Sequence, residues 1–317
     1  MIVYRPFRNT DPPGLAEIWR TQAPERGLAQ PMSAALMETH LLAKPYFERQ
    51  ALIVAEQGSE LVGFAHAAFG PNAAGTDIDT HLGVTCLVMV RASHQRQGIG
   101  AQLLEHSERY LCRHGARTLQ AGGISPNHAF YLGLYGGSGL PGVLASAPRA
   151  EKLFRSHGYR ELRRICVLHR DLAGFRPVFD RTHVQIRRRT LLQVEYDPLP
   201  ATWWEACTEA PFERTRFTLQ SRDAQTPMAT ATFWDIQPLS QSWGVLTAGL
   251  SHLHVAPPLR RQGLGSYLLG EALHALARQG FAMVEAQLPA DQPGLMSLFH
   301  RLGFIQVDVG YVLQKDV

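Results

Sequence analysis

Two short glycine-containing turns are the parts of the sequence best suited to bind an anion. Residues 95–100 read QRQGIG, and residues 260–265 read RRQGLG. Each turn follows an apolar run typical of a strand and precedes apolar residues at helical spacing. The first N–H groups of a helix have no partner inside it and lie at the positive end of its dipole, and glycine lets a ligand approach the backbone closely. The pattern therefore predicts a pyrophosphate site at each turn.

The glycine spacing excludes two common nucleotide-binding motifs. A dinucleotide fingerprint requires a third glycine three residues after the second, where this chain has Leu103 and Leu268. A P-loop requires Gly-Lys followed by Ser or Thr, and the sequence contains no Gly-Lys pair. Both turns instead resemble motif A of the GNAT family of acyl-CoA N-acyltransferases, which reads Gln or Arg, two residues, Gly, one residue, then Gly or Ala. The resemblance implies that acetyl-CoA (CoA) is the ligand.

The resemblance also implies which residues contact this cofactor. In the family, the strand before motif A offers backbone groups to the pantetheine and the carbonyl, and the turn holds the pyrophosphate. In the first copy the expected contacts are Val88, Met89, Val90, Gln95, Arg96, Gln97, Gly98, Ile99, Gly100 and Ala101. In the second copy they are Leu253, His254, Val255, Arg260, Arg261, Gln262, Gly263, Leu264, Gly265 and Ser266.

Amine acylation requires a base for the amine, donors for the developing oxyanion and, in many cases, an acid for the thiolate. The family's frequent glutamate base lies six residues before the last valine of the motif strand, where this chain has Val84 and Gly249. Its frequent tyrosine acid lies four residues before a Gly-aromatic pair, where this chain has Phe154 and Phe299. None of these four side chains can exchange a proton, so the usual catalytic positions are apolar in both copies.

A long segment that occurs only in the first copy, residues 125–147, offers substitutes. Long loops in compact domains are often lids or binding loops. Its Tyr131 and Tyr135 are candidate proton donors to the sulfur, and its His128 is a candidate base. The alternative is a loop that packs between the domains through its aromatic side chains. We expect the chemistry to be concentrated in the first copy, because that copy has more material to shape an acceptor cleft.

The repeated order of elements predicts how the turns are held. The resemblance covers nearly the whole chain and implies an α/β fold of two tandem domains, each with a central, mostly antiparallel sheet flanked by helices. We expect the domains to be residues 1–172, with the inserted loop 125–147, and residues 182–317. Residues 184–188 are expected to form the first strand of the second domain. The sheet should splay apart at residues 88–90 and near residues 253–255.

Composition narrows the environment and the partners. A net charge of +4 and a pI of about 9.0 suit an anionic ligand. The sequence contains no basic stripe with interleaved aromatic residues, so it does not suggest a nucleic-acid partner. The sequence contains no run of about 18 apolar residues, so we expect no membrane span. The cysteines form no CxxC pair and are expected to be reduced thiols of a cytoplasmic protein, with no metal site; they are Cys86, Cys112, Cys166 and Cys207.

These observations lead to a preferred function and an alternative from a different class. The preferred function is an acyl-CoA-dependent N-acyltransferase that moves an acetyl group from acetyl-CoA to a primary amine. The acceptor is expected to be a small-molecule or peptide amine, and the protein a monomer or homodimer. The alternative is a non-catalytic CoA-binding or interaction protein in which one or both domains are degenerate. The apolar catalytic positions favour the alternative, whereas the intact turns favour the enzyme.

Overall fold

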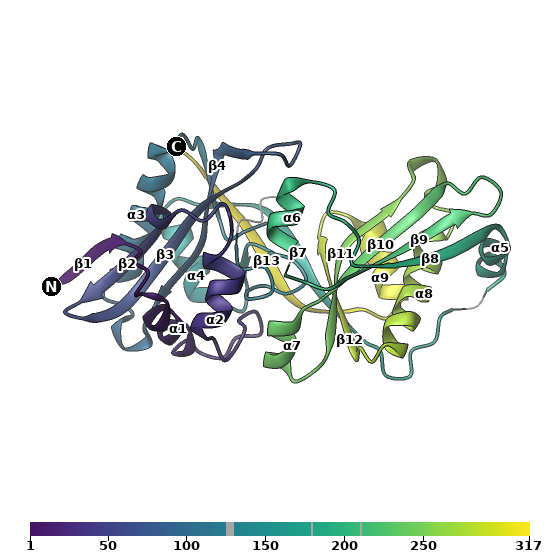
Figure 1. Ribbon diagram of the computed structural model, residues 1–317, viewed down its shortest axis with the longest axis horizontal. Coiled ribbons are helices and arrows are strands. Elements are labelled where there is room, and N and C mark those ends of the chain that lie inside the picture. Colours follow the sequence, from purple (N-terminus) through teal and green to yellow (C-terminus); the bar gives the residue numbers. More distant parts are fainter. Residues whose placement is uncertain (125–129, 179, 210) are drawn as a thin grey trace.

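The computed structural model describes residues 1–124, 130–178, 180–209 and 211–317, in two halves placed end to end (Figure 1). The first half contains, in order, β1 (Ile2–Pro6), α1 (Pro12–Arg20), α2 (Ala34–Met37), a π-helical turn (Glu38–Leu42), a 3-10 turn (Arg49–Ala51), β2 (Leu52–Gln57), β3 (Glu60–Pro71), β4 (Ile78–Val90), a 3-10 turn (Ala92–His94), α3 (Ile99–Arg113), β5 (Thr118–Ala121), β6 (Val143–Leu144), α4 (Pro148–Ser156) and β7 (Arg160–Asp171).

The second half repeats much of this order. It contains α5 (Arg181–Arg189), β8 (Thr190–Tyr196), α6 (Trp203–Glu209), β9 (Arg214–Ser221), β10 (Pro227–Asp235), α7 (Gln237–Trp243), β11 (Thr247–Val255), a 3-10 turn (Pro257–Leu259), α8 (Leu264–Arg278), β12 (Met283–Pro289), α9 (Pro293–Arg301) and β13 (Ile305–Asp316).

One continuous sheet joins the halves, because their final strands are exchanged. The strand order is β1-β2-β3-β4-β5-β13-β7-β12-β11-β10-β9-β8. Thus β13, which ends the chain, pairs with β5 of the first half, and β7 pairs with β12 of the second. The ladders are antiparallel except for β4 with β5 and β11 with β12. The predicted mixed α/β fold with mostly antiparallel sheets is confirmed, and the exchange means that the halves cannot separate without breaking backbone ladders.

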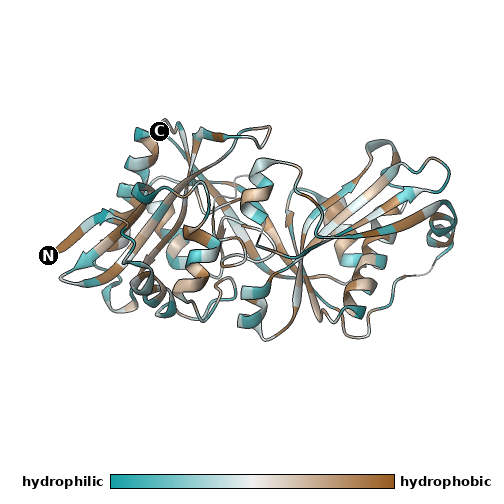
Figure 2. Ribbon diagram, viewed as in Figure 1, coloured by the Kyte–Doolittle hydropathy of each residue, from teal (hydrophilic) through white to brown (hydrophobic). Residues whose placement is uncertain are grey.

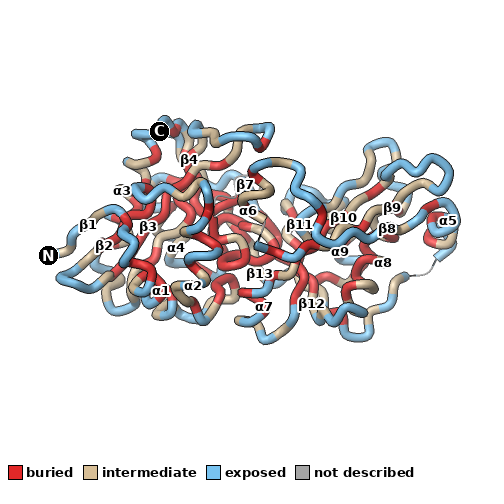
Figure 3. The backbone as a smooth tube through the Cα atoms, viewed as in Figure 1, coloured by how far each residue is buried: buried red, intermediate tan, exposed pale blue. Residues whose placement is uncertain are grey.

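Helices cover the sheet because their apolar residues recur on one side. In the first half, Trp19 of α1 packs in the same cluster as Val54, whereas Leu103 of α3 packs with the neighbouring Ile53. Successive strand residues point to opposite faces, so α1 and α3 cover opposite faces. In the second half, α8 packs on β9, β10 and β11. The apolar, buried parts follow the central strands of both halves (Figures 2 and 3). Within the described residues, no helix is long and apolar enough to cross a membrane.

The expectation of a strand at residues 184–188 was wrong, because this segment belongs to helix α5. The Asp180 side chain accepts a hydrogen bond from the N–H of His183 at 2.8 Å, which caps the helix. His183 and Ile186 are its buried residues, and they lie three positions apart, as one helical face requires. The arginines at 187–189 occupy the last turn, where the helix dipole favours positive charge. The strand begins only at Thr190.

The halves also meet through one buried carboxylate. Glu285 of β12 is fully buried, and its oxygens lie 2.7 Å from Arg26 Nη1 and 2.8 Å from His169 Nε2. The N–H of Ser138 donates to the same carboxylate at 2.7 Å. Burial acts to raise the pKa of Glu285, but His169 and Arg26 outweigh it, so the pKa lies below its ordinary value. The charged form is therefore the one that joins the halves.

Glu285→Gln keeps the side-chain size but removes this charge. We expect the variant to lose about 3–5 kcal/mol of unfolding free energy near neutral pH, because Arg26 is left without its anion. A carboxyl whose folded-state pKa is lowered stabilises the fold above its unfolded value, here 4.5, and this contribution is lost as the pH falls through the folded-state pKa. The difference between wild type and variant should therefore shrink on acidification, which urea denaturation at several pH values measures.

Glu161→Gln is the matched control for this prediction. Glu161 pairs with Arg155 and Arg164 on the protein surface. Its loss should cost less than about 1 kcal/mol, because water and salt screen exposed pairs. Equal losses in the two variants, or a Glu285→Gln deficit that persists in acid, would contradict the assigned role of Glu285.

Candidate functional site

The two glycine turns have the same backbone geometry. Arg96 and Gly98 have φ of 63° and 82°, and Arg261 and Gly263 have φ of 64° and 84°. These left-handed conformations are easy for glycine and costly for most other residues. In both turns a short 3-10 helix leads into the left-handed pair, and the long helix begins directly after the glycine. The equal spacing in the sequence therefore corresponds to equal local structure.

Both turns fit an anion such as a pyrophosphate. The first intrahelical bonds after each turn are Gln102 N–H to Gly98 O and Tyr267 N–H to Gly263 O, so the N–H groups just before them lie at the open end of the helix. A methyl group at Gly100 would have no neighbour closer than 3.7 Å, and one at Gly265 none closer than 3.5 Å. A side chain at either position would therefore fit without displacing a neighbouring atom.

The strand before each turn is bulged and then leaves its parallel neighbour. The register with the adjacent antiparallel strand shifts beside Cys86 in β4 and beside Ser251 in β11. Pairing of β4 with β5 ends at Thr85, and pairing of β11 with β12 ends at Gly249. The predicted splay of the sheet is confirmed in both halves. Beyond Thr85 and Gly249, neither strand pairs with its parallel neighbour within the described residues. The backbone edge left there is one to which an extended ligand can hydrogen-bond.

The first splay is closed on the face that carries α1. Cys86 and Met89 of β4 are buried, and they belong to one cluster with Tyr131 and Leu144 of the segment that follows β5. At the equivalent positions of β11, 165 residues further on, Ser251 and His254 are exposed. The two splays are therefore alike in backbone and opposite in accessibility.

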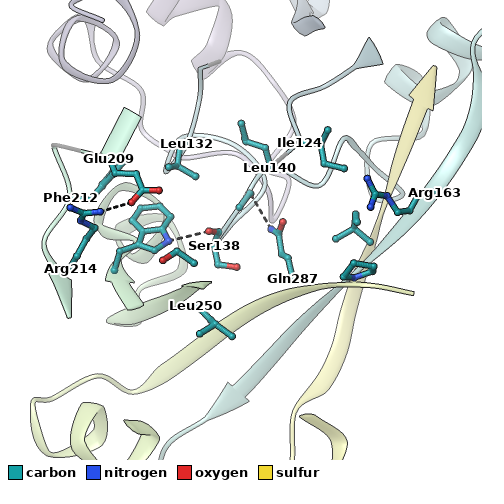
Figure 4. A pocket seen from close by; sticks show the side chains of 15 residues that line it. Ile124, Leu132, Ser138, Leu140, Arg163, Glu209, Phe212, Arg214, Leu250 and Gln287 are labelled. Carbon is teal, nitrogen blue, oxygen red and sulfur yellow. Dashed lines mark hydrogen bonds and ion pairs between the residues drawn. The ribbon is translucent and has the colours of Figure 1, made fainter. Parts of the chain in front are cut away.

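The second splay opens into a cavity of about 200 Å³, which we call the splay cavity (Figure 4). Its walls come from both halves of the chain, and Ile124 and residues 132–140 of the first half lie across from strands of the second. The lining residues are Ile124, Leu132, Ser138, Gly139, Leu140, Arg163, Ile165, Glu209, Phe212, Arg214, Trp234, Leu250, Ser251, Gln287 and Pro289.

Charged groups lie at opposite ends of this cavity. Glu209 and Arg214 form one end, and Arg163 lies at the other (Figure 4). Burial raises the pKa of Glu209, and this effect outweighs the Arg214 guanidinium, whose Nη1 is 2.8 Å from the carboxylate. Arg214 also bonds Glu205 and the carbonyl of Pro198, so its donors are largely committed. Glu209 is the only carboxylate among the described residues that line the cavity.

The predicted proton donors lie elsewhere. Tyr131 is 1% exposed, its hydroxyl is 3.2 Å from His66 Nδ1, and burial raises its pKa well above the ordinary value. The Tyr135 hydroxyl accepts the N–H of Leu144, and burial raises its pKa as well. These surroundings favour packing over proton transfer for both tyrosines, and the two hydroxyl contacts lie within the first half. His128 lies outside the described residues.

Sequence reasoning missed the residues that form the cavity. Glu209, Trp234 and Gln287 belong to three elements that carry no motif, and they become neighbours only through the tertiary fold. The only available signal was the constant offset of 165 residues between the repeats. Once Cys86 is known to lie at the bulge of β4, this offset places Ser251 at the bulge of β11.

The chain matches known proteins at the level of family and fold. The model of the Acetyltransferase (GNAT) family matches residues 14–134 and again residues 184–304. No curated protein matches the sequence. A tandem GNAT protein from the clavulanic acid biosynthesis pathway, solved without acetyl-CoA, is 15% identical with a TM-score of 0.67, and the alignment covers 100% of this chain and 98% of that one.

Two further solved structures share the fold. A GCN5-related N-acetyltransferase from Sphaerobacter thermophilus is 16% identical with a TM-score of 0.65, covering 99% of this chain and 95% of that one. A glucosamine N-acetyltransferase region of a fungal multidomain GH3 β-N-acetylglucosaminidase is 15% identical with a TM-score of 0.71, covering 99% of this chain and 38% of that one. With both halves matched by the family model and both turns in the same geometry, the chain belongs to the GNAT acetyltransferase family, as a tandem of two such domains.

Proposed function

We propose that the second half is an N-acetyltransferase site that uses acetyl-CoA to acetylate a primary amine bound in the splay cavity. The observation that carries the proposal is the position of this cavity. It adjoins the free edge of β11 beyond Gly249, and it is lined by Gln287 of β12. Strand β11 thus parts from β12 before it leads into the turn suited to a pyrophosphate, and the pocket lies beside the parted strands.

The chain's own groups can hold the cofactor without further partners. Acetyl-CoA supplies an activated acyl thioester. The N–H groups of Leu264, Gly265 and Ser266 face the open helix end, and Arg261 is exposed beside them. Arg260 Nε donates to the carbonyl of Val255 at 3.1 Å, which fixes the turn against the strand end. The first turn offers the same backbone groups, and we propose that it binds CoA without a pocket for an acceptor.

Glu209 is the group best suited to take a proton from the amine. Glu209 is half-buried in the cavity wall, and a carboxyl with a raised pKa is a stronger base than one with the ordinary value. Arg214 orients it by the ion pair described above. The cavity walls combine polar side chains with the apolar rings of Phe212 and Trp234, so the acceptor we propose is a small-molecule or peptide amine with an apolar group next to it.

A non-catalytic CoA-binding protein is the competing function. It is favoured by the apolar residues at the family's usual catalytic positions, since Phe154 and Phe299 are both buried and without polar atoms in their side chains. Release of free thiol from acetyl-CoA in the presence of a panel of amines separates the two functions, because only the enzyme releases thiol in an amine-dependent manner.

Gly265→Asp and Gly100→Asp form a matched pair that tests which half works. Both positions have room for a Cβ atom, so both variants should fold. Each carboxylate would repel a pyrophosphate and displace its hydrogen bonds, which should weaken CoA binding at that turn by about 2 kcal/mol or more, roughly 30-fold. We expect amine-dependent thiol release to be lost in Gly265→Asp and largely kept in Gly100→Asp. The reverse pattern would assign turnover to the first half.

Glu209→Gln tests the base. The carboxylate is the active form, so wild-type kcat/KM should rise with pH through a value above the ordinary carboxyl pKa of 4.5, since burial raises this pKa. The variant should lose about 100-fold in kcat and should lack this rise. Glu205→Gln is the control, because Glu205 also pairs with Arg214 but does not line the cavity. A Glu209→Gln profile that keeps the wild-type acid limb would exclude Glu209 as the base.

A further inference from the structure

Ser138 lies at the apex of the second splay, although it comes from the first half. A methyl group added at Gly249, the last residue of β11 paired with β12, would lie 2.8 Å from Cβ of Ser138. The residue opposite Gly249 in that last pair is Glu285, and its carboxylate accepts the N–H of Ser138 at 2.7 Å. On the other side of Gly249, Trp234 Nε1 donates to the carbonyl of Ser138 at 3.1 Å. Ser138 is therefore in contact with Gly249 and with the two residues paired with it, Glu285 and Trp234, at the point where β11 and β12 part.

The chain around Ser138 is shaped for this approach. Gly137 has φ of 139°, and a methyl group there would lie 1.7 Å from Glu285 Oε1, so the position accepts only glycine. The carbonyl of Gly139 accepts a hydrogen bond from Gln287 Nε2 at 3.1 Å. The backbone on each side of Ser138 is thus fixed to β12, and this arrangement presents the serine side chain to the splay.

The hydroxyl itself has no hydrogen-bond partner among the described residues. Ser138 is 4% exposed and lines the splay cavity, yet its Oγ is buried without a hydrogen bond among the described residues. A buried hydroxyl that lacks a partner destabilises the folded protein, and a ligand group that accepts its hydrogen bond removes this cost. The two backbone groups of Ser138 are already bonded, so the protein would keep the loop in place with alanine there. The hydroxyl is consequently the feature that packing does not explain.

We propose that Ser138 is a catalytic residue of the second half's site, where its hydroxyl donates a hydrogen bond to the carbonyl oxygen of the acyl thioester. The inference rests on the proposed function. In the reaction, the amine nitrogen forms a bond to the acyl carbon, the carbon–sulfur bond breaks with its electron pair leaving on sulfur as the CoA thiolate, and the amine proton passes to Glu209. Ser138 keeps its own proton throughout, and its hydrogen bond strengthens as negative charge develops on the carbonyl oxygen.

This assignment gives the first half a chemical role in the second half's reaction. Phe299, at the family's usual tyrosine position, is fully buried in the cluster that contains α8 and cannot donate a hydrogen bond. Ser138 lies in the cavity on the other side of β12, since Glu285 and Gln287 alternate with Ala286 and Leu288 of that cluster. Of the described cavity residues in the second half, Ser251 donates to the carbonyl of Thr232 and Gln287 to that of Gly139, so the unpartnered hydroxyl at the apex is the one that the first half supplies.

Ser138→Ala is the test, because it removes only the unpartnered hydroxyl. We expect kcat to fall about 10- to 100-fold with little change in the KM of the amine, and the thermal midpoint to stay equal or rise. Independently of turnover, calorimetry should show that the variant weakens the binding of acetyl-CoA several-fold more than the binding of CoA, which lacks the acyl carbonyl. Ser138→Cys, which retains the shape with a weaker donor, should give intermediate values for kcat and for this affinity ratio.

Ser242→Ala is the matched control. Its hydroxyl bonds the backbone of Gln30 across the two halves and does not line the cavity. This variant should lose stability and keep the ratio of acetyl-CoA to CoA affinity. The proposal is overturned if Ser138→Ala keeps both wild-type kcat and the wild-type ratio, or if it only lowers the thermal midpoint. If wild type acetylates no amine, the proposed function fails, and the affinity ratio alone decides whether Ser138 contacts the acyl group.

Discussion

The buried carboxylate of Glu285 is the interaction on which the arrangement of the site depends. It lies in the last pair formed by β11 and β12, and it is bonded by Arg26 and Ser138 of the first half and by His169 of the exchanged strand β7. A charge in so dry a place is tolerated only when several donors surround it. Those donors come from three separate segments, so satisfying Glu285 brings the first half's loop to the point where the strands part.

The two halves share the same local backbone structure, but the surroundings of this structure differ. Each has a left-handed glycine turn, a bulged strand and a parallel ladder that ends early. In the first half, the segment after β5 covers the strand beyond the ladder, and Met89 is buried there. The same segment continues to Ser138 and Leu140 and forms a wall of the splay cavity of the second half. One inserted segment thus closes one site and completes the other.

Local features of the site could be predicted from the sequence, because the physics behind them is local. A left-handed residue next to a helix start requires glycine, so Gly98 and Gly263 were recognisable by type and spacing. The contacts of Ser138 with Glu285 could not be predicted, because the two residues lie 147 positions apart and neither belongs to a motif. The exchange of β7 and β13 is equally non-local, because either strand could form the same kind of backbone ladder in the sheet of either half.

The misassigned helix α5 shows a different limit. Val184 and Ile186 alternate as in a strand, and five residues do not distinguish that period from one helical face. The side-chain cap from Asp180 and the burial of His183 beside Tyr267 favour the helix. The placement of Tyr131 and Tyr135 illustrates a related point. A tyrosine in a glycine-rich insertion resembles a lid residue in sequence, but its ring can equally be part of the core, as the stacking of Tyr131 on Trp19 shows.

A crystal structure of the full chain with acetyl-CoA tests the central claim most directly. We expect a pyrophosphate on the N–H groups after Gly263, a pantetheine along the free edge of β11, and an acyl carbonyl oxygen within hydrogen-bond distance of Ser138 Oγ. Acetyl-CoA bound only at the turn after Gly98, with its thioester between β4 and β5 and the splay cavity unchanged, would contradict it.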